Sequence, residues 1–407
     1  MTTVTPTTCI PTPTPPGGTM SRSTATALPF GLTEEQQTVS AMVRDFADTE
    51  IAPHALEWDQ QHHFPIDVIR KSAELGMGGI YVREESGGTG MGRMDAALIF
   101  EAMSTGCPSV AAYISIHNMV AWMIDKYGNE EQREKYLLPL VSMEHLGSYC
   151  LTEPNAGSDA GALRTTARED GDHFVLNGVK QFISGAGSTD TYLVMARTGQ
   201  EGARGISAFI LEKGMDGLSF GANEQKMGWR AQPTRQVIME NVRVPKENLL
   251  GEPGQGFKIA MSGLDGGRLN IGACSLGGGQ SALEKAIEYM GERQAFGTEL
   301  TGFQALRFEV AEMQTKLEAA RSLLWRAANA YDAGDPNTSL LSAMAKLTAT
   351  DSGFDVANRA LQLHGGYGYL TEYGIEKLVR DLRVHQILEG TNEIMRVIIS
   401  RKSTGVG

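Results

Sequence analysis

The chain has 407 residues, 41% hydrophobic and 21% charged, enough for two or three soluble domains with buried cores. Its formal net charge of −12 argues against nucleic acid as a partner, because binding a phosphate backbone requires a cationic surface. No run of about 18 apolar residues is present, so we expect no membrane-spanning helix and no membrane partner.

Residues 1–29 are rich in Thr, Pro and Ser and carry a single charge, which predicts a disordered tail. The tail has neither the apolar stretch of a secretory signal nor the several arginines of a transit peptide, and Met20 is an alternative start. The four cysteines lie far apart in the sequence without a Cys-x-x-Cys pair, so we expect no disulfide framework and no metal site.

The sequence pattern of residues 30–146 predicts a helical domain. Thr33 and Gln36 have the spacing of a capping box, and apolar residues at helical spacing follow from Val39. The helical pattern continues to about His145, with a glycine-rich interruption at residues 86–92.

The sequence pattern of residues 147–255 predicts a β domain. Asn177-Gly178 stands between two apolar runs, which is a strong signal for a hairpin turn. Three further strands are expected, at residues 191–197, 206–213 and 235–244.

Residues 256–407 return to a helical pattern. An apolar stripe from Leu306 to Tyr331 alternates steps of four and three residues, which favours the core of a helix bundle over a coiled-coil dimer. Gly277-x-Gly279-x-x-Ala282 fits a loose dinucleotide fingerprint, but no strand precedes it, so we favour close helix packing at small residues.

Three polar stretches interrupt these patterns. Residues 149–159 carry hydroxyls and turn residues that suit polar or anionic parts of a ligand, and residues 362–368 contain glycines that permit close backbone approach. In the third stretch, Glu389 precedes a glycine and Thr391, which can cap the following helix. Taken singly, each stretch is better explained by an ordinary turn or helix cap.

Taken together, in this order and at these separations, the three stretches resemble the acyl-CoA dehydrogenase family. They match its Thr-Glu-x-x-x-Gly-Ser-Asp motif at residues 152–159, its motif from Gln362 to Arg380-Asp381, and its Glu-Gly-Thr motif at residues 389–391. The resemblance covers residues 32–402. It implies an α+β fold with an N-terminal helical domain, a middle β-barrel-like domain and a C-terminal four-helix bundle, and it implies FAD between the domains.

The resemblance also implies the chemistry. Glu389 would take the α-proton of an acyl-CoA thioester while the β-hydrogen leaves as hydride, and the thioester carbonyl would accept a hydrogen bond from the Glu389 backbone N–H. Some family members place the base immediately before Arg268, but that position is Gly267 here. A carboxylate enclosed by ligand should have a raised pKa, because desolvation disfavours its charged form.

Binding residues follow from the same resemblance. Substrate contacts are implied at Ser158, Asp265, Arg268 and Gly390. Flavin contacts are implied at Tyr149, Cys150, Leu151, Thr152, Gly157, Ser158, Phe182, Ile183, Ser184, Phe303, Gln362, Leu363, His364, Gly365, Gly366, Thr391, Asn392 and Glu393. Arg293 and Gln304 match positions that reach the flavin of a neighbouring subunit, which implies a homotetramer built as a dimer of dimers.

Residues 112–118, 232–235 and 385–395 look most like branched-chain members of the family, as does Phe182 in place of a tryptophan. Isobutyryl-CoA is therefore the leading substrate, followed by 2-methylbutyryl-CoA and butyryl-CoA, with an electron-transfer flavoprotein as acceptor. The expected compartment is the bacterial cytoplasm or, in a eukaryote, the mitochondrial matrix. The alternatives are an oxidase, a nitroalkane-oxidising flavoprotein, which would use Asp as base, and a DNA-associated flavoprotein, which would carry a basic extension.

Overall fold

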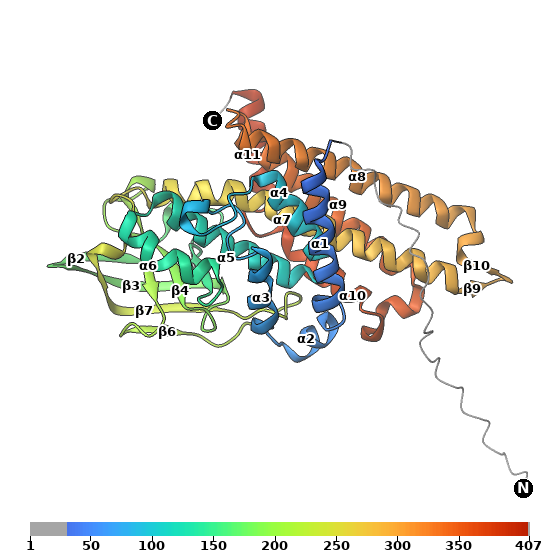
Figure 1. Ribbon diagram of the computed structural model, residues 1–407, viewed down its shortest axis with the longest axis horizontal. Helices are drawn as coiled ribbons and strands as arrows, with labels where there is room; N and C mark the ends of the chain where they lie inside the picture. Colours follow the sequence, from blue (N-terminus) through green and yellow to red (C-terminus); the bar gives the residue numbers. More distant parts are fainter. Residues whose placement is uncertain (1–30, 406–407) are drawn as a thin grey trace, which may run out of the picture. The chain divides into compact units, whose positions relative to one another are not determined.

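The computed structural model describes residues 31–405, so the tail expected at residues 1–29 lies outside the described residues (Figure 1). The described residues from Thr33 onward pack into one unit. None of the helices in the described part combines the length and the apolar character of a membrane span.

The N-terminal part of this unit is helical, as predicted. The Thr33 hydroxyl accepts a hydrogen bond from the Gln36 N–H at 3.1 Å, and the Gln36 side chain accepts from the Thr33 N–H at 3.2 Å, which confirms the capping box. The helices are α1 (Glu34–Phe46), α2 (Ala55–Gln61), α3 (Ile66–Lys71), α4 (Arg93–Ser104), α5 (Pro108–Tyr127) and α6 (Glu130–Val141).

A mixed sheet follows, in the order β6-β7-β3-β2-β4-β5-β8, with β1 paired in parallel to β4. Its strands are β1 (Gly147–Cys150), β2 (Thr166–Asp170), β3 (His173–Ser184), β4 (Thr191–Arg197), β5 (Ile206–Glu212), β6 (Leu218–Phe220), β7 (Thr234–Pro245) and β8 (Leu249–Leu250). Alternate residues of β4 serve two cores. Leu193 and Met195 pack towards α5 and α7, whereas Tyr192 and Val194 pack within the β domain.

The predicted strands at 191–197, 206–213 and 235–244 are confirmed, but the predicted hairpin turn at Asn177-Gly178 is wrong. Strand β3 runs through both residues, and the ladder with β7 is irregular there, with Gly178 at φ 150°. The Asn177 side chain also pairs with Asn241 across the two strands. The turn lies instead at Gly171, with φ 64°, between β2 and β3. Asn-Gly served here as a bulge within a long strand.

The C-terminal part consists of long helices. They are α7 (Gly256–Glu292), α8 (Gln304–Asp332), α9 (Thr338–Leu363), α10 (Ile375–Arg383) and α11 (Asn392–Thr404), with a short hairpin of β9 (Gln294–Ala295) and β10 (Thr298–Glu299). In Figure 1, α7 connects the sheet, at the left of the view, with this hairpin at the right. The stripe of α8 is buried from Met313 to Ala327, although Leu306 remains partly accessible.

The glycines of the loose dinucleotide fingerprint lie inside α7, where they permit close helix packing. A Cβ on Gly279 would lie 3.1 Å from the Cα of Gly353 on α9, and a Cβ on Gly277 would lie 2.1 Å from the Glu101 carbonyl oxygen on α4. The interpretation as helix packing is therefore confirmed.

Candidate active site

Glu389 lies in a tight turn between residues 384–386 and helix α11. Both Glu389 and Gly390 adopt left-handed backbone, with φ angles of 56° and 87°. A glycine takes this conformation freely, whereas a glutamate in it is strained by about 1–3 kcal/mol. The Thr391 hydroxyl accepts from the Ile394 N–H at 3.3 Å and caps α11, as predicted. The surrounding structure therefore has to hold Glu389 in place.

The carboxylate of Glu389 is enclosed. Its Oε2 atom has no solvent contact and no hydrogen-bond partner in the part of the chain that the structure describes, although another part of the residue remains accessible. Burial raises the pKa of Glu389 to about 7, and the positive charges of Arg268 and Lys346 act in the opposite direction. A carboxylate that titrates near neutral pH is suited to accept a proton from a weak acid.

Helix α7 faces this carboxylate with a glycine. A Cβ on Gly267 would lie 2.5 Å from Oε2 of Glu389, so no other residue type fits there without moving the acid. A side chain at position 267, immediately before Arg268, would therefore enter the space that the Glu389 carboxylate occupies.

Tyr149 on β1 supplies a second isolated polar group. Its hydroxyl is buried and has no hydrogen-bond partner within residues 31–405. Burial, followed by the negative charge of Glu389, raises the pKa of Tyr149 well above its usual range. Buried polar groups are nearly always paired in folded proteins. Two unpaired groups that interact with each other, one from the sheet and one from the C-terminal helices, fit a ligand held between these two parts.

The sheet also presents an accessible surface. Phe182 is 63% exposed and adopts φ 59°, Ser158 is exposed, and a Cβ on Gly157 would meet nothing within 4 Å. An exposed phenyl ring is suited to pack against a flat aromatic ligand. The side chains of Cys150 and Ile183 belong to the core of the sheet, so only their backbones can meet a ligand.

Three of the predicted flavin residues are hydrogen-bonded to the sheet through their carbonyl oxygens. The carbonyl of Leu151 accepts from Lys180 at 3.1 Å, that of Thr152 from the Gln181 N–H at 2.8 Å, and that of Ser184 from the Ser148 hydroxyl at 2.7 Å. The Thr152 hydroxyl has no hydrogen-bond partner among residues 31–405 and is available to a ligand.

A separate hollow of about 580 Å³ lies at the C-terminal end of α9. Its lining includes Arg293 and residues 362–366, and Cβ atoms on Gly365 and Gly366 would meet nothing within 4 Å. His364 is fixed there by stacking on Tyr289, with 4.5 Å between ring centroids. Neither Glu389 nor Tyr149 lines this hollow, and Phe303 and Gln304 lie outside it at the start of α8. The predicted flavin residues therefore form two groups.

Asp265, Arg268 and Gly390, three of the four predicted substrate residues, lie at the Glu389 turn, whereas Ser158 lies in the loop after β1. Arg268 is buried, forms an ion pair with Asp265, and donates from Nε to the Glu389 carbonyl oxygen at 3.4 Å. Asn392 is buried and hydrogen-bonded to α9, whereas the Glu393 side chain is 79% exposed. Asn392 therefore supports the turn, and the Glu393 side chain faces solvent.

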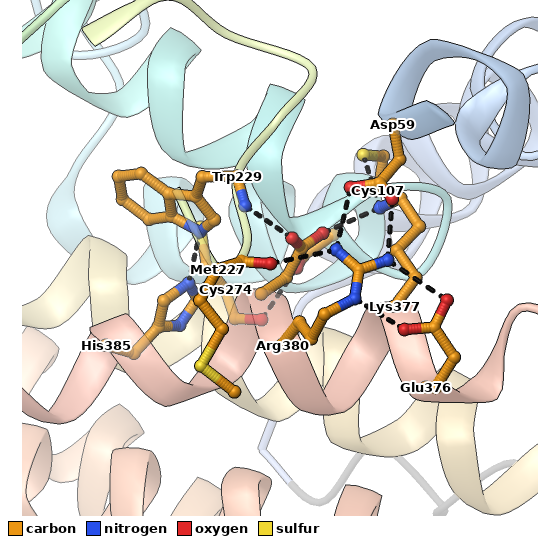
Figure 2. Close-up of polar contacts among 11 residues, drawn as sticks. Asp59, Cys107, Met227, Trp229, Cys274, Glu376, Lys377, Arg380 and His385 are labelled. Atoms are coloured by element: carbon orange, nitrogen blue, oxygen red, sulfur yellow. Dashed lines mark hydrogen bonds and ion pairs between the residues drawn. The ribbon is translucent and has the colours of Figure 1, made fainter. Parts of the chain in front are cut away.

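The chain segment that leads into this turn is anchored across the sheet–helix boundary (Figure 2). The Trp229 indole N–H donates to Nε2 of His385 at 3.1 Å, and Nδ1 of His385 lies 2.7 Å from the Ser275 hydroxyl. An indole nitrogen can only donate, so Nε2 is an acceptor and His385 is neutral. Burial, followed by the charge of Lys346, lowers the pKa of His385 to about 3, which agrees with this assignment.

Helix α10 adds charged contacts to the same boundary. The N–H of Trp229 donates to Asp381 at 2.6 Å, Asp381 pairs with the buried Lys377 at 2.6 Å, and Arg380 binds Asp59 at 2.6 Å (Figure 2). Arg380-Asp381 of the second motif therefore joins the sheet, the N-terminal helices and the segment before Glu389.

Family models match in three successive segments along the chain. The N-terminal, middle and C-terminal domains of acyl-CoA dehydrogenase match residues 33–144, 148–242 and 254–404. The chain belongs to the acyl-CoA dehydrogenase family. Its helical, β and helical parts are those of the acyl-CoA dehydrogenase fold, so the predicted fold class is confirmed.

Several acyl-CoA dehydrogenases are similar over nearly the whole chain. The mitochondrial isobutyryl-CoA dehydrogenase of Dictyostelium discoideum is 55% identical over 91% of this chain and 90% of its own length. That of Bos taurus is 52% identical over 91% of this chain and 89% of its own length. The solved structure of butyryl-CoA dehydrogenase from Megasphaera elsdenii is 39% identical, covers 93% of this chain and 100% of its own, and superposes with a TM-score of 0.89.

Sequence reasoning missed residues around Glu389 that no motif marks. Lys346 on α9 and Tyr81 are both buried, and both interact with Glu389. Arg93 lies over the Tyr81 ring, with 3.6 Å between Cζ and the centroid. The only sign of Lys346 in the sequence is that it is a single lysine within the mostly apolar run at residues 341–349. A lone lysine in such a run does not by itself indicate a site.

Proposed function

We propose that this chain is an FAD-dependent dehydrogenase that converts isobutyryl-CoA to methacrylyl-CoA in valine breakdown, with Glu389 as the base that removes the α-proton. The observation that carries the proposal is the enclosed, unpaired carboxylate of Glu389, with its pKa raised to about 7, beside the unpaired hydroxyl of Tyr149. The two relatives that are more than half identical support isobutyryl-CoA as the substrate. Short-chain and 2-methylbutyryl-CoA are the alternative substrates.

Residues of the β domain fit a flavin. Phe182 offers an exposed ring to a flat ring system, and the loop after β1 exposes Ser158. FAD, when bound, supplies the acceptor for the hydride that leaves the β-carbon. The hollow at Arg293 and residues 362–366 would hold a further part of the cofactor, either its own or that of a neighbouring subunit.

Two groups of Glu389 act on the thioester. The carboxylate takes the α-proton, and the low polarity that raises its pKa also raises its basicity. The backbone N–H of Glu389 donates to no acceptor within residues 31–405, so it is free to bind the thioester carbonyl oxygen. A fixed donor aimed at the oxygen on which negative charge develops stabilises the transition state.

An electron-transfer flavoprotein would remove the electrons from the reduced enzyme. One similar solved structure, 44% identical, is described as an electron-transferring flavoprotein of Acidaminococcus fermentans, which supports this partnership. We also propose a homotetramer in which Arg293 and Gln304 approach the flavin of a neighbouring subunit. The mitochondrial names of the two isobutyryl-CoA relatives support the mitochondrial matrix as the compartment of a eukaryotic enzyme, and the cytoplasm would correspond in a bacterium.

The test combines a substrate panel with removal of the base. We expect anaerobic isobutyryl-CoA to bleach the flavin absorbance faster than 2-methylbutyryl-CoA or butyryl-CoA. Glu389→Gln should retain FAD, judged by its absorbance spectrum, and should lose at least about 100-fold in the rate of bleaching, because it lacks the proton acceptor. Near-normal bleaching by this variant would remove Glu389 from the mechanism, and rapid peroxide formation in air by the wild type would indicate an oxidase.

A further inference from the structure

Three lysines are deeply buried within residues 31–405, and one of them differs from the others. Lys180 pairs with Glu153 at 2.7 Å, and Lys377 pairs with Asp381 at 2.6 Å. Lys346 is equally buried, yet its ammonium donates only to neutral oxygens. Burying a cation is costly without a compensating negative charge, so the difference requires a physical reason.

The two acceptors of Lys346 belong to residues that follow Glu389 in the turn, Gly390 and Asn392. Its Nζ lies 2.9 Å from the carbonyl oxygen of Gly390 and 2.9 Å from Oδ1 of Asn392. Asn392 is held further by Thr350 and Asp351 of the same helix, α9. His385 anchors the chain before the turn, and Lys346 anchors it after the turn. Both anchors hold a glutamate whose left-handed backbone is strained.

The charge that compensates Lys346 is that of Glu389. Burial is the main influence on Lys346 and lowers its pKa to about 8, and Glu389 is the strongest influence that opposes burial. Asp351 and Glu393 act in the same direction, whereas Arg268 repels it. The charged groups that act on Glu389 itself are Arg268 on α7 and Lys346 on α9, and the phenols of Tyr149 and Tyr81 also interact with it.

The two cations that act on Glu389 are not equivalent. Arg268 has the larger effect on the pKa of Glu389 but also forms an ion pair with Asp265, whereas Lys346 has no carboxylate within ion-pair distance among the described residues. Lys346 is therefore the cation near Glu389 whose direct contacts are all with neutral oxygens.

We propose that Lys346 is a positioning residue of the dehydrogenation site, which fixes the Glu389 turn through Gly390 and keeps the base in its ionised form. The inference rests on the proposed role of Glu389. Between about pH 7 and about pH 8, the main form of the resting site holds an ammonium and a carboxylate that interact through space. This attraction is lost when Glu389 takes the α-proton. Lys346 therefore increases the fraction of Glu389 that is ionised and lowers the affinity of Glu389 for the proton.

The experiment separates the charge of Lys346 from its contacts. Lys346→Met removes the charge and both hydrogen bonds, and Lys346→Gln removes the charge but keeps a donor for Gly390. Thr350→Val is the matched control, because it removes a neutral hydrogen bond to Asn392 in the same cluster and leaves the lysine in place. If the methionine variant does not fold, the glutamine variant gives the answer.

Two measurements are made on the purified holoenzyme. The first is the pH dependence of kcat/KM with isobutyryl-CoA. Both Lys346 variants should shift the acid limb upward by about one pH unit, which is a tenfold loss at about pH 6. This loss should shrink above about pH 8, where wild-type Lys346 has itself lost its proton. Thr350→Val should keep the wild-type limb.

The second measurement follows the Glu389 carboxyl directly by infrared difference spectroscopy against pH, without substrate, with Glu389→Gln to assign the band. The protonated band should persist to higher pH in both Lys346 variants. An unchanged acid limb and an unchanged titration would overturn the inference, as would an equal shift in Thr350→Val. Because the infrared titration needs no turnover, it remains decisive even if isobutyryl-CoA is not oxidised, an outcome that would count only against the proposed function.

Discussion

Two glutamates stand in two signature motifs of this chain, and the fold treats them in opposite ways. Glu153 follows Thr152 in the first motif, and its carboxylate accepts from the buried Lys180 at 2.7 Å and from the N–H groups of Arg164 and Thr165 at 2.6 and 3.0 Å. Burial alone would raise the pKa of Glu153, but Lys180 and these donors outweigh it, and the pKa is lowered. Glu389 has no comparable donor on its enclosed oxygen, and its pKa is raised to about 7.

The difference shows what turns a buried carboxylate into a base. Direct hydrogen bonds to the charged form hold a carboxylate ionised and make it part of the structure. Cations that act only through space, as Lys346 does on Glu389, leave the carboxylate lone pairs free to accept a proton. Substitutions at the two sites should therefore affect different properties.

The largest effect on stability is expected at the paired glutamate. Glu153→Gln leaves the buried ammonium of Lys180 without its carboxylate, which should cost about 3–5 kcal/mol of unfolding free energy. Chemical denaturation of the wild type and the variant at neutral pH measures this loss of unfolding free energy. The double variant Glu153→Gln/Lys180→Met should recover much of the loss. If the single variant were as stable as the wild type, Glu153 and Lys180 would not be a structural pair.

At Glu389, removing the carboxylate should raise the free energy of unfolding rather than lower it. A pKa of about 7 in place of the usual 4.5 corresponds to about 3 kcal/mol. Because the folded-state pKa is raised, this stability is present below about pH 4.5 and is lost as the pH rises through about 7. Glu389→Gln should therefore stabilise the holoenzyme by up to about 3 kcal/mol at pH 8 and hardly at all at pH 5. Thermal unfolding at both pH values tests this, and a destabilised variant at pH 8 would contradict the assigned burial.

A smaller change should separate activity from stability. Gly267→Ala puts a Cβ 2.5 Å from Oε2 of Glu389, and the flexible end of that side chain can move away. We expect an intact fold but a fall in kcat of about tenfold or more, since a displaced base costs catalysis. Gly291→Ala on the same helix is the control, because its Cβ would meet nothing within 4 Å. That control should be stabilised by about 0.5–1 kcal/mol with unchanged kcat. Equal kcat in both variants would show that the Gly267 contact is unimportant.

Local patterns predicted most of the secondary structure because they depend on neighbours in the sequence. The capping box at Thr33, the helix cap at Thr391 and the strands at 191–197 and 206–213 are confirmed. The error at Asn177-Gly178 has a definite cause. Asn-Gly permits a turn but does not require one, and pairing with β7, in which Asn241 lies 64 residues after Asn177, keeps β3 continuous through a bulge.

The sequence by itself determined the family, the order of the domains and the two motif glutamates, because these depend on residue types at fixed spacing. The family resemblance singled out Glu389 as the base, but residue types alone do not explain why Glu389 rather than Glu153 would accept a proton, since Glu153 meets Lys180 and Glu389 meets Lys346 only after distant segments pack together. Proton affinity depends on burial and on charges contributed by other elements. Only the tertiary structure therefore shows why one carboxylate is held ionised while the other stays free to accept a proton.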